Sequence, residues 1–225
     1  MEFLDFLGRF FKEGGIFMYP ITFLLAFGVA VVIERGYVLF KKFNLDGAKY
    51  YNFIEQKLLS KEIHEAIKGS PDVPLSNIIR FGLEMLLKLQ KQEVQDQERF
   101  IKGERRFSVL FEKNIEEIAS LEFPKIDRRL HLLPTIANLA TLLGLLGTLQ
   151  GLIKSFTAVS GLDPAKRAQV LAQGISVAMN TTAYGLFVAV VVLFMYSILN
   201  NRAERIKDMT EYYVLKFINF VTMRY

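Results

Sequence analysis

Four threonines lie within two long stretches of the chain that contain no charged residue. Thr141 and Thr148 belong to residues 132–153, and Thr181 and Thr182 belong to residues 168–201. A hydroxyl in an otherwise apolar helix can form part of a polar path for an ion, although it can also return its hydrogen bond to a carbonyl of its own helix. We therefore predict these four threonines to be ion-pathway residues.

Small residues accompany the threonines at helical spacing. They recur at steps of three and four residues, which places each set on one helical face. The two sets are Ala137, Thr141, Gly144, Thr148, Gly151 and Ser155 in the first stretch, and Ala178, Thr182, Gly185 and Ala189 in the second. Small residues let membrane helices approach closely, so Gly144, Gly147, Gly151 and Gly185 are the predicted helix-packing residues. Two interpretations stay open, since these stripes can line an ion path or can serve helix packing alone.

The two stretches hold no acidic or basic side chain that ionises near neutral pH, because Asp, Glu, Lys, Arg and His are missing from both. Proton relays inside membranes use ionisable groups. If this chain takes part in proton conduction, a partner helix must therefore supply the titrating acid.

The sequence offers few candidate residues for enzyme catalysis or for binding a metal or cofactor. The chain has no cysteine and two histidines, His64 in a charged stretch and His131 at the edge of an apolar one. It contains no metal-ligand cluster, and its glycines at 144, 147 and 151 lie in an apolar helix instead of a phosphate-binding or nucleophile loop. We expect no enzyme activity, no metal and no cofactor.

The composition separates apolar from charged residues. Of 225 residues, 52% are hydrophobic and 23% are charged, which is typical of a membrane protein with aqueous parts. The net charge is +5, but basic and acidic residues are interleaved, so we expect no nucleic-acid partner.

Three stretches are long and apolar enough to cross a bilayer as helices: residues 14–33, 132–153 and 168–201. A hydrocarbon core takes about 20 residues of helix, and a backbone in lipid must satisfy its own hydrogen bonds. Lys and Arg are more numerous after the first stretch, before the second and after the third than at the opposite ends. The positive-inside rule then places the N-terminus outside and the C-terminus in the cytoplasm.

The predicted fold is an all-α integral membrane protein with three transmembrane helices and long cytoplasmic helical extensions. Phe and Leu residues near the N-terminus share one helical face, which predicts a periplasmic interfacial helix over 1–15. We expect transmembrane helices over 16–36, 132–156 and 173–200, a cytoplasmic helical region over 37–131, a periplasmic loop over 157–172 and a cytoplasmic C-terminal helix over 201–225.

The three spans resemble those of the ExbB/TolQ/MotA family of proton-channel stators, most closely its ExbB and TolQ branch. The first contains Tyr19-Pro20-Ile21 and ends in Glu34-Arg35. The second contains LLGLLGTLQGLIKSF (142–156) and the third GISVAMNTTAYGLFVAV (174–190). These motifs are similar to the family's GLLGT core and to its third-span pattern, and they place the family threonines at Thr148 and Thr182.

Two positions depart from the family pattern. Thr141 stands where a proline commonly precedes the second-span motif, and Val177 stands where ExbB and TolQ proteins commonly carry a glutamate. The second departure excludes a proton path that relies on a glutamate from this subunit at that position, and it suggests a sub-branch other than standard ExbB or TolQ.

The resemblance implies a multi-pass protein of the bacterial inner (cytoplasmic) membrane that forms a homopentamer. The ring would surround two copies of a single-span partner similar to ExbD or TolR, which carries a membrane aspartate. Ion flow past that aspartate would drive rotation and deliver force to the cell envelope. The alternative is a non-conducting membrane assembly scaffold. Proton and sodium both stay open as the driving ion, as does the envelope process that is powered.

Overall fold

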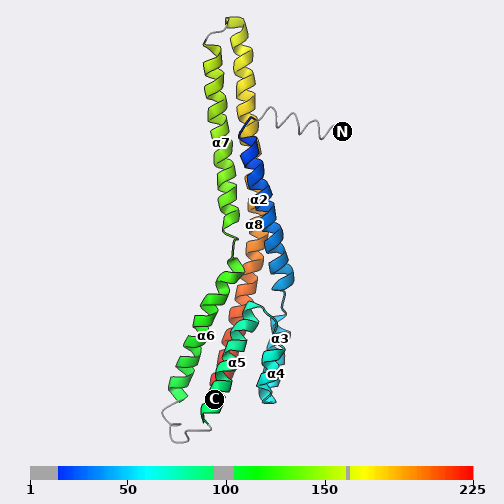
Figure 1. Cartoon of the computed structure of the whole chain (residues 1–225), viewed down its shortest axis with the longest axis vertical. Coiled ribbons are helices and arrows are strands. Elements are labelled where there is room, and N and C mark those ends of the chain that lie inside the picture. Colours follow the sequence, from blue (N-terminus) through cyan, green and yellow to red (C-terminus); the bar gives the residue numbers. More distant parts are fainter. Residues whose placement is uncertain (1–14, 94–103, 161–162, 225) are drawn as a thin grey trace. The chain divides into compact units, whose positions relative to one another are not determined.

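The computed structural model describes residues 15–93, 104–160 and 163–224, and all regular elements in these ranges are helices (Figure 1). In chain order they are α2 (Met18–Tyr37), the π-helical turn η1 (Val38–Lys42), α3 (Gly47–Leu59), α4 (Ile63–Lys68), α5 (Pro74–Glu93), α6 (Glu104–Asp127), α7 (Leu132–Val159) and α8 (Pro164–Thr222). The predicted interfacial helix over 1–15 lies almost wholly outside the described residues.

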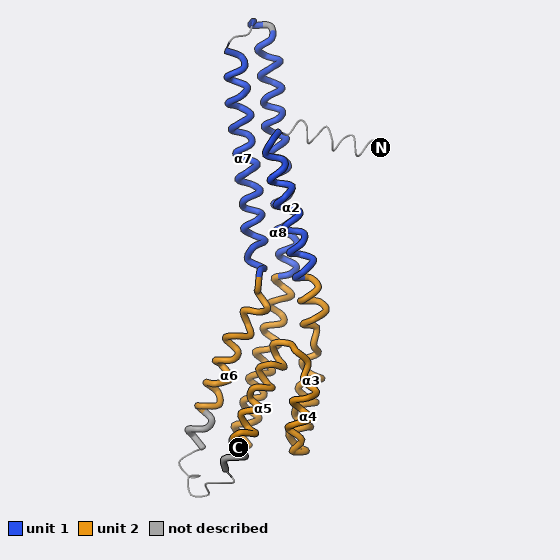
Figure 2. The backbone as a smooth tube through the Cα atoms, in the orientation of Figure 1, with its two compact units in different colours: residues 1–35, 129–199 blue, residues 36–128, 200–225 orange. Residues whose placement is uncertain are grey.

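The chain divides into two compact units (Figure 2). Unit 1 comprises residues 1–35 and 129–199, and unit 2 comprises residues 36–128 and 200–225. Three helical segments are long and apolar enough to cross a membrane, over Met18–Lys42, Val109–Val159 and Lys166–Thr222. The all-helical architecture and the three apolar helices confirm that part of the predicted fold, while the orientation in the membrane stays a prediction.

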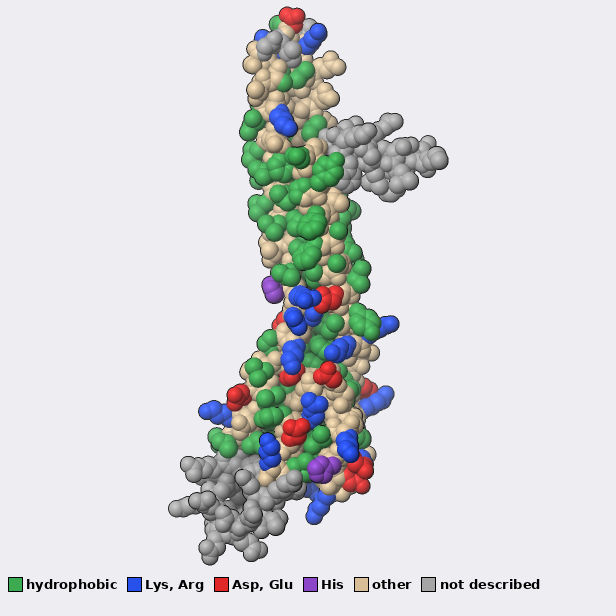
Figure 3. All heavy atoms as spheres, viewed as in Figure 1, with side chains coloured by type: hydrophobic (Ala, Val, Ile, Leu, Met, Phe, Trp, Pro, Cys, Tyr) green, Lys and Arg blue, Asp and Glu red, His purple; other side chains and the backbone are tan. Residues whose placement is uncertain are grey.

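In unit 1, α2 packs one face against both α7 and α8. A Cβ atom added to Gly28 would lie 3.3 Å from Val192 of α8 and 3.5 Å from Ile136 of α7. The opposite face of α2 exposes large apolar side chains, including Phe23 and Phe27. Figure 3 shows hydrophobic side chains gathered over the middle part of the visible face of this unit. Such a surface needs a cover of lipid or protein.

The helix starts follow from local sequence. In α3, the Asp46 side chain accepts a hydrogen bond from the Lys49 backbone N–H at 3.3 Å, which satisfies one of the donors that a helix N-terminus leaves free. Pro74 and Pro164 occupy the first positions of α5 and α8, where proline loses no helical hydrogen bond.

Unit 2 has its own apolar core, formed by α3, α4, α5, α6 and the last part of α8. Its largest fully buried side chains include Ile54, Ile78, Phe111 and Phe217. A Cβ atom on Gly82 would lie 2.6 Å from the Phe217 ring, so this glycine allows α5 to approach α8 closely.

Helical structure extends into the predicted loop over 157–172. α7 continues to Val159, and α8 begins at Pro164 and runs without interruption to Thr222. The first turn of α8 is closed by hydrogen bonds from the backbone N–H groups of Lys166 and Arg167 to the Asp163 carbonyl, at 2.9 and 3.2 Å. Ala, Lys, Arg and Gln follow Pro164, and these residues favour a helix wherever a proline starts one.

Candidate functional site

Glycines bring the backbones of α7 and α8 into direct contact. A Cβ atom on Gly185 would lie 2.6 Å from the Ala140 carbonyl oxygen and 3.0 Å from the Gly144 Cα. A Cβ atom on Gly151 would lie 2.8 Å from the Ala178 Cβ, and one on Gly147 would overlap the Thr181 side chain. All four predicted packing glycines are buried and therefore lie at this helix interface.

The close approach joins two of the predicted threonines. The hydroxyl oxygens of Thr148 on α7 and Thr182 on α8 contact each other. Both are also within hydrogen-bond distance of one carbonyl oxygen, that of Gly144, at 3.2 Å for Thr148 and 2.9 Å for Thr182. Both side chains are half-buried. Two hydroxyls and a backbone carbonyl thus form one polar cluster, which we call the threonine pair.

The other two predicted threonines lie outside this cluster. The Thr141 hydroxyl donates to the Ala137 carbonyl at 3.1 Å, and the Thr181 hydroxyl donates to the Val177 carbonyl at 3.0 Å. Each bond returns to the preceding turn of the same helix, which is a common arrangement for threonine in a helix. Thr181 is almost fully buried against Gly147, so its position fits packing between α7 and α8.

The threonine pair has spare capacity to accept hydrogen bonds. Each hydroxyl supplies one donor and two acceptor lone pairs. If Thr182 donates to the Gly144 carbonyl, Thr148 can donate to Thr182, and the lone pairs of Thr148 remain available. Such a cluster can receive a donor, for example a protonated carboxyl group, a hydronium ion or a hydrated cation. It cannot titrate near neutral pH by itself, because a threonine hydroxyl is not ionisable in that range.

Charged side chains are absent from the described surroundings of the threonine pair. Lys154 directly follows residues 132–153, and Arg167 directly precedes residues 168–201. Both side chains are exposed. Val177, the position at which the resemblance leads one to expect a glutamate, is half-buried, and a Cβ atom on Gly15 would lie 3.7 Å from its Cγ1 atom. In the described ranges, no cluster of His, Cys, Asp and Glu could hold a metal ion.

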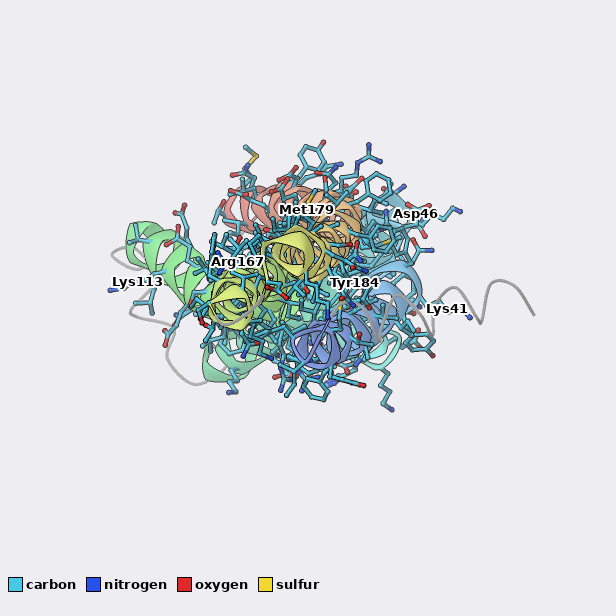
Figure 4. All side chains as sticks on the ribbon, turned by 90° about the horizontal axis from the view of Figure 1, so that it is seen from above. Lys41, Asp46, Lys113, Arg167, Met179 and Tyr184 are labelled. Atoms are coloured by element: carbon cyan, nitrogen blue, oxygen red, sulfur yellow. The ribbon has the colours of Figure 1, made fainter. Side chains whose placement is uncertain are left out.

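One polar contact in unit 1 was not predicted. The Tyr184 hydroxyl of α8 lies 3.0 Å from the Thr22 hydroxyl of α2, and Tyr184 is on the α2 side of α8 (Figure 4). A tyrosine inside a membrane span indicates a hydrogen-bond partner, but the sequence does not say on which helix. At the interface of α7 and α8, Ser155, a member of the predicted small-residue stripe, occupies the space that a side chain at position 174 would need.

Comparison with known proteins points to a single family. The model of the MotA/TolQ/ExbB proton channel family matches residues 74–212. The Tol-Pal system protein TolQ of Haemophilus influenzae is 29% identical over 214 residues, covering 91% of this chain and 88% of that protein. A putative biopolymer transport protein, an ExbB homologue of Methanothermobacter thermautotrophicus, is 27% identical over 222 residues, which cover 93% of this chain and 72% of that protein. The putative biopolymer transport protein ExbB-like 3 of Synechocystis is 30% identical over 189 residues, which cover 82% of this chain and 80% of that protein.

Proposed function

Because the chain belongs to the MotA/TolQ/ExbB proton channel family, we propose that it is the ring-forming subunit of a proton-driven motor in the bacterial inner membrane. Membership makes it a multi-pass membrane transport protein and not an enzyme. Five copies would surround two copies of a single-span partner similar to ExbD or TolR, and ion flow would be coupled to mechanical work in the cell envelope.

The observation that carries this proposal is the threonine pair. Thr148 and Thr182 come from different helices and lie beside the same carbonyl, that of Gly144. A hydroxyl that served only its own helix would need none of these contacts between helices. The pair offers acceptors in a segment where an unsolvated charge is costly, and so supports a role in lowering the free energy of an ion or acid that passes.

The missing acid assigns the proton-carrying step to the partner. Neither residues 132–153 nor residues 168–201 contain an Asp, Glu, Lys, Arg or His side chain. Hydroxyls can donate and accept hydrogen bonds, but they do not hold and release a proton near neutral pH as a carboxylate does. In this proposal the aspartate of the partner carries the proton, and the threonine pair receives hydrogen bonds from its protonated form.

A proton-flux measurement tests the proposal. Liposomes would contain this protein alone, this protein with its partner, or this protein with a partner whose membrane aspartate is changed to asparagine. We expect flux from the second sample only. Flux from this chain alone that matches the complex would contradict the shared site.

The same experiment separates motor from scaffold. The close contact of α7 and α8 through Gly144 and Gly185 is the observation that favours a packing role for the small-residue stripes. A complex that assembles but conducts no protons in any of the three samples would favour the non-conducting scaffold.

A further inference from the structure

A second hydroxyl contact holds α8 near the level of the threonine pair. The Tyr184 hydroxyl of α8 lies 3.0 Å from the Thr22 hydroxyl of α2. The Thr22 hydroxyl donates to the Met18 carbonyl of its own helix at 2.8 Å, so its single hydrogen is engaged and Tyr184 is the donor to Thr22. Tyr184 and Thr182 are two residues apart, which is about 3 Å along the helix axis. At nearly one level, α8 therefore makes one polar contact with α2 and another with α7.

The two contacts lie on nearly opposite sides of α8. At about 100° per residue, Thr182 and Tyr184 are about 200° apart around the helix axis. A rotation of α8 about its own axis therefore moves the two hydroxyls in opposite directions and strains both contacts. A rotation of about 20° displaces each Cα atom by about 0.8 Å, and the hydroxyl oxygens, which lie further from the axis, move more. The bond to Thr22 thus resists a rotation that would carry Thr182 away from the Gly144 carbonyl, now at 2.9 Å.

α2 can act as the fixed reference because it packs against both other helices of unit 1. A Cβ atom on Gly28 would lie 3.3 Å from Val192 of α8 and 3.5 Å from Ile136 of α7. Thr22 precedes Gly28 by six residues on α2. On α8, Tyr184 precedes Val192 by eight residues. The two helices therefore run side by side, in the same direction, from the hydroxyl contact to the glycine contact.

The sequence of α2 places a hydroxyl at this one contact. Between residues 16 and 33, Tyr19 and Thr22 are the only residues with a polar side chain. Tyr19 is 67% exposed, whereas Thr22 is half-buried and faces Tyr184. A hydroxyl among apolar helices is favourable only when it has a hydrogen-bond partner. The pair therefore specifies which side of α8 meets α2.

We propose that Tyr184 and Thr22 are positioning residues for the threonine pair. Their hydrogen bond sets the rotation of α8 about its axis, and this rotation keeps the Thr182 hydroxyl beside Thr148 and the Gly144 carbonyl. In the motor both residues act through Thr182, without contact to the passing ion. The effect on proton flux rests on the proposed function, whereas the effect on the geometry of the threonine pair does not.

Two variants remove the bond and leave the packing nearly unchanged. Tyr184→Phe keeps the ring and Thr22→Val keeps the branched shape, so each removes one hydroxyl. Because both break the same hydrogen bond, each should lower proton flux per assembled complex to a similar degree, and the double variant should lower it no further. Thr22→Ser keeps the hydroxyl and should retain the flux of the wild type. Tyr196→Phe, which changes another half-buried tyrosine of α8, is the matched control and should conduct normally.

A spectroscopic measurement separates positioning from simple helix packing. Isotope-labelled threonine methyl groups report by NMR on the surroundings of Thr148 and Thr182, in this chain alone in nanodiscs. In Tyr184→Phe and in Thr22→Val both signals should shift. The signal of Thr135, which is exposed near the start of α7, should stay in place. The control Tyr196→Phe should move none of these signals.

Each result has a distinct meaning. Unshifted signals of Thr148 and Thr182 in both variants would overturn the inference and leave the bond a plain contact between α2 and α8. Shifted signals with normal flux would also overturn it, because the threonine pair would then work without this positioning. A wild-type complex with partner that conducts no protons would instead refute the proposed function, and the methyl signals would still decide whether Tyr184 and Thr22 set the rotation of α8.

Discussion

Gly185→Ala should separate α7 from α8 and break the threonine pair without altering either threonine. The new Cβ atom would lie 2.6 Å from the Ala140 carbonyl oxygen, whereas ordinary van der Waals contact begins at 3.4 Å. The obstacle is backbone, which cannot rotate away as a side chain can. Relieving the overlap therefore requires a shift of about 0.8 Å if α8 moves directly away from that oxygen.

A shift of this size changes the hydrogen bonds between the helices. The Thr182 hydroxyl is 2.9 Å from the Gly144 carbonyl oxygen, and adding about 0.8 Å takes the pair beyond hydrogen-bond distance. Overpacking of this kind costs about 1–3 kcal/mol. Replacing glycine by alanine inside a helix stabilises the helix by up to about 1 kcal/mol. The net loss of folding free energy is therefore smaller than the cost of the overlap alone.

Gly36→Ala is the matched control. Gly36 also lies in a helix, and a Cβ atom there would meet nothing within 4 Å. The gain in helix propensity is common to both variants, so the difference between their free energies of unfolding isolates the overlap, about 1–3 kcal/mol. Equilibrium unfolding in mixed micelles measures that difference, and proton flux with the partner measures function. Equal stabilities for the two variants, or normal flux from Gly185→Ala, would refute this account of the α7–α8 contact.

Three further predictions concern the hydroxyls, the assembly and a surface carboxylate. Thr148→Val and Thr182→Val should each abolish proton flux and leave assembly intact, at a stability cost near the ~0.6 kcal/mol average for a hydrogen bond between membrane helices; near-normal flux would return both residues to a packing role. Native mass spectrometry should give a pentamer, and a stable monomer or dimer in nanodiscs would count against it. In unit 2 the Asn77 amide, at 3.2 Å, and then Lys42 hold the pKa of Asp72 below its ordinary value, and this stabilisation is present above the ordinary pKa and lost as pH falls through the lowered one. Asn77→Ala should raise the pKa of Asp72 in a carboxyl NMR titration, and an unchanged midpoint would contradict the assignment.

The sequence predicts the existence of the three long apolar helices because each contains a long stretch without charged residues. Two uncharged stretches and the apolar first span are enough to identify the three long helices, and the spacing of Gly144, Gly147 and Gly151 identifies a face. The residue pattern of one helix does not predict which face of which other helix packs against it. The contact between Thr148 and Thr182 depends on the relative level of two helices, and that level is set by contacts such as Gly151 with Ala178.

Other features depend on packing that no local pattern records. Thr141 and Thr148 are equivalent by spacing, yet only Thr148 reaches a hydroxyl on α8. The bond between Tyr184 and Thr22 joins residues that are 162 positions apart. The helical extension of α7 and α8 into the predicted loop depends on ordinary helix-forming residues around Pro164, which an argument from hydropathy does not weigh.

The glycine contact between α7 and α8 also limits where this protein can move. With Gly185 against the Ala140 carbonyl and Gly144, the two backbones touch at this point, and the small side chains of Ala178 and Thr181, which lie between the helices elsewhere, leave little room to slide or repack. Shear motions in proteins take place across interdigitated side chains, so the α7–α8 hairpin should behave as one stiff piece during a work cycle. In the proposed motor, any rearrangement that accompanies ion passage would then occur where hairpins of different copies meet, or between a hairpin and the proposed partner helix. Those contacts, and not the interior of the hairpin, are where mutations should alter the coupling of ion flow to motion.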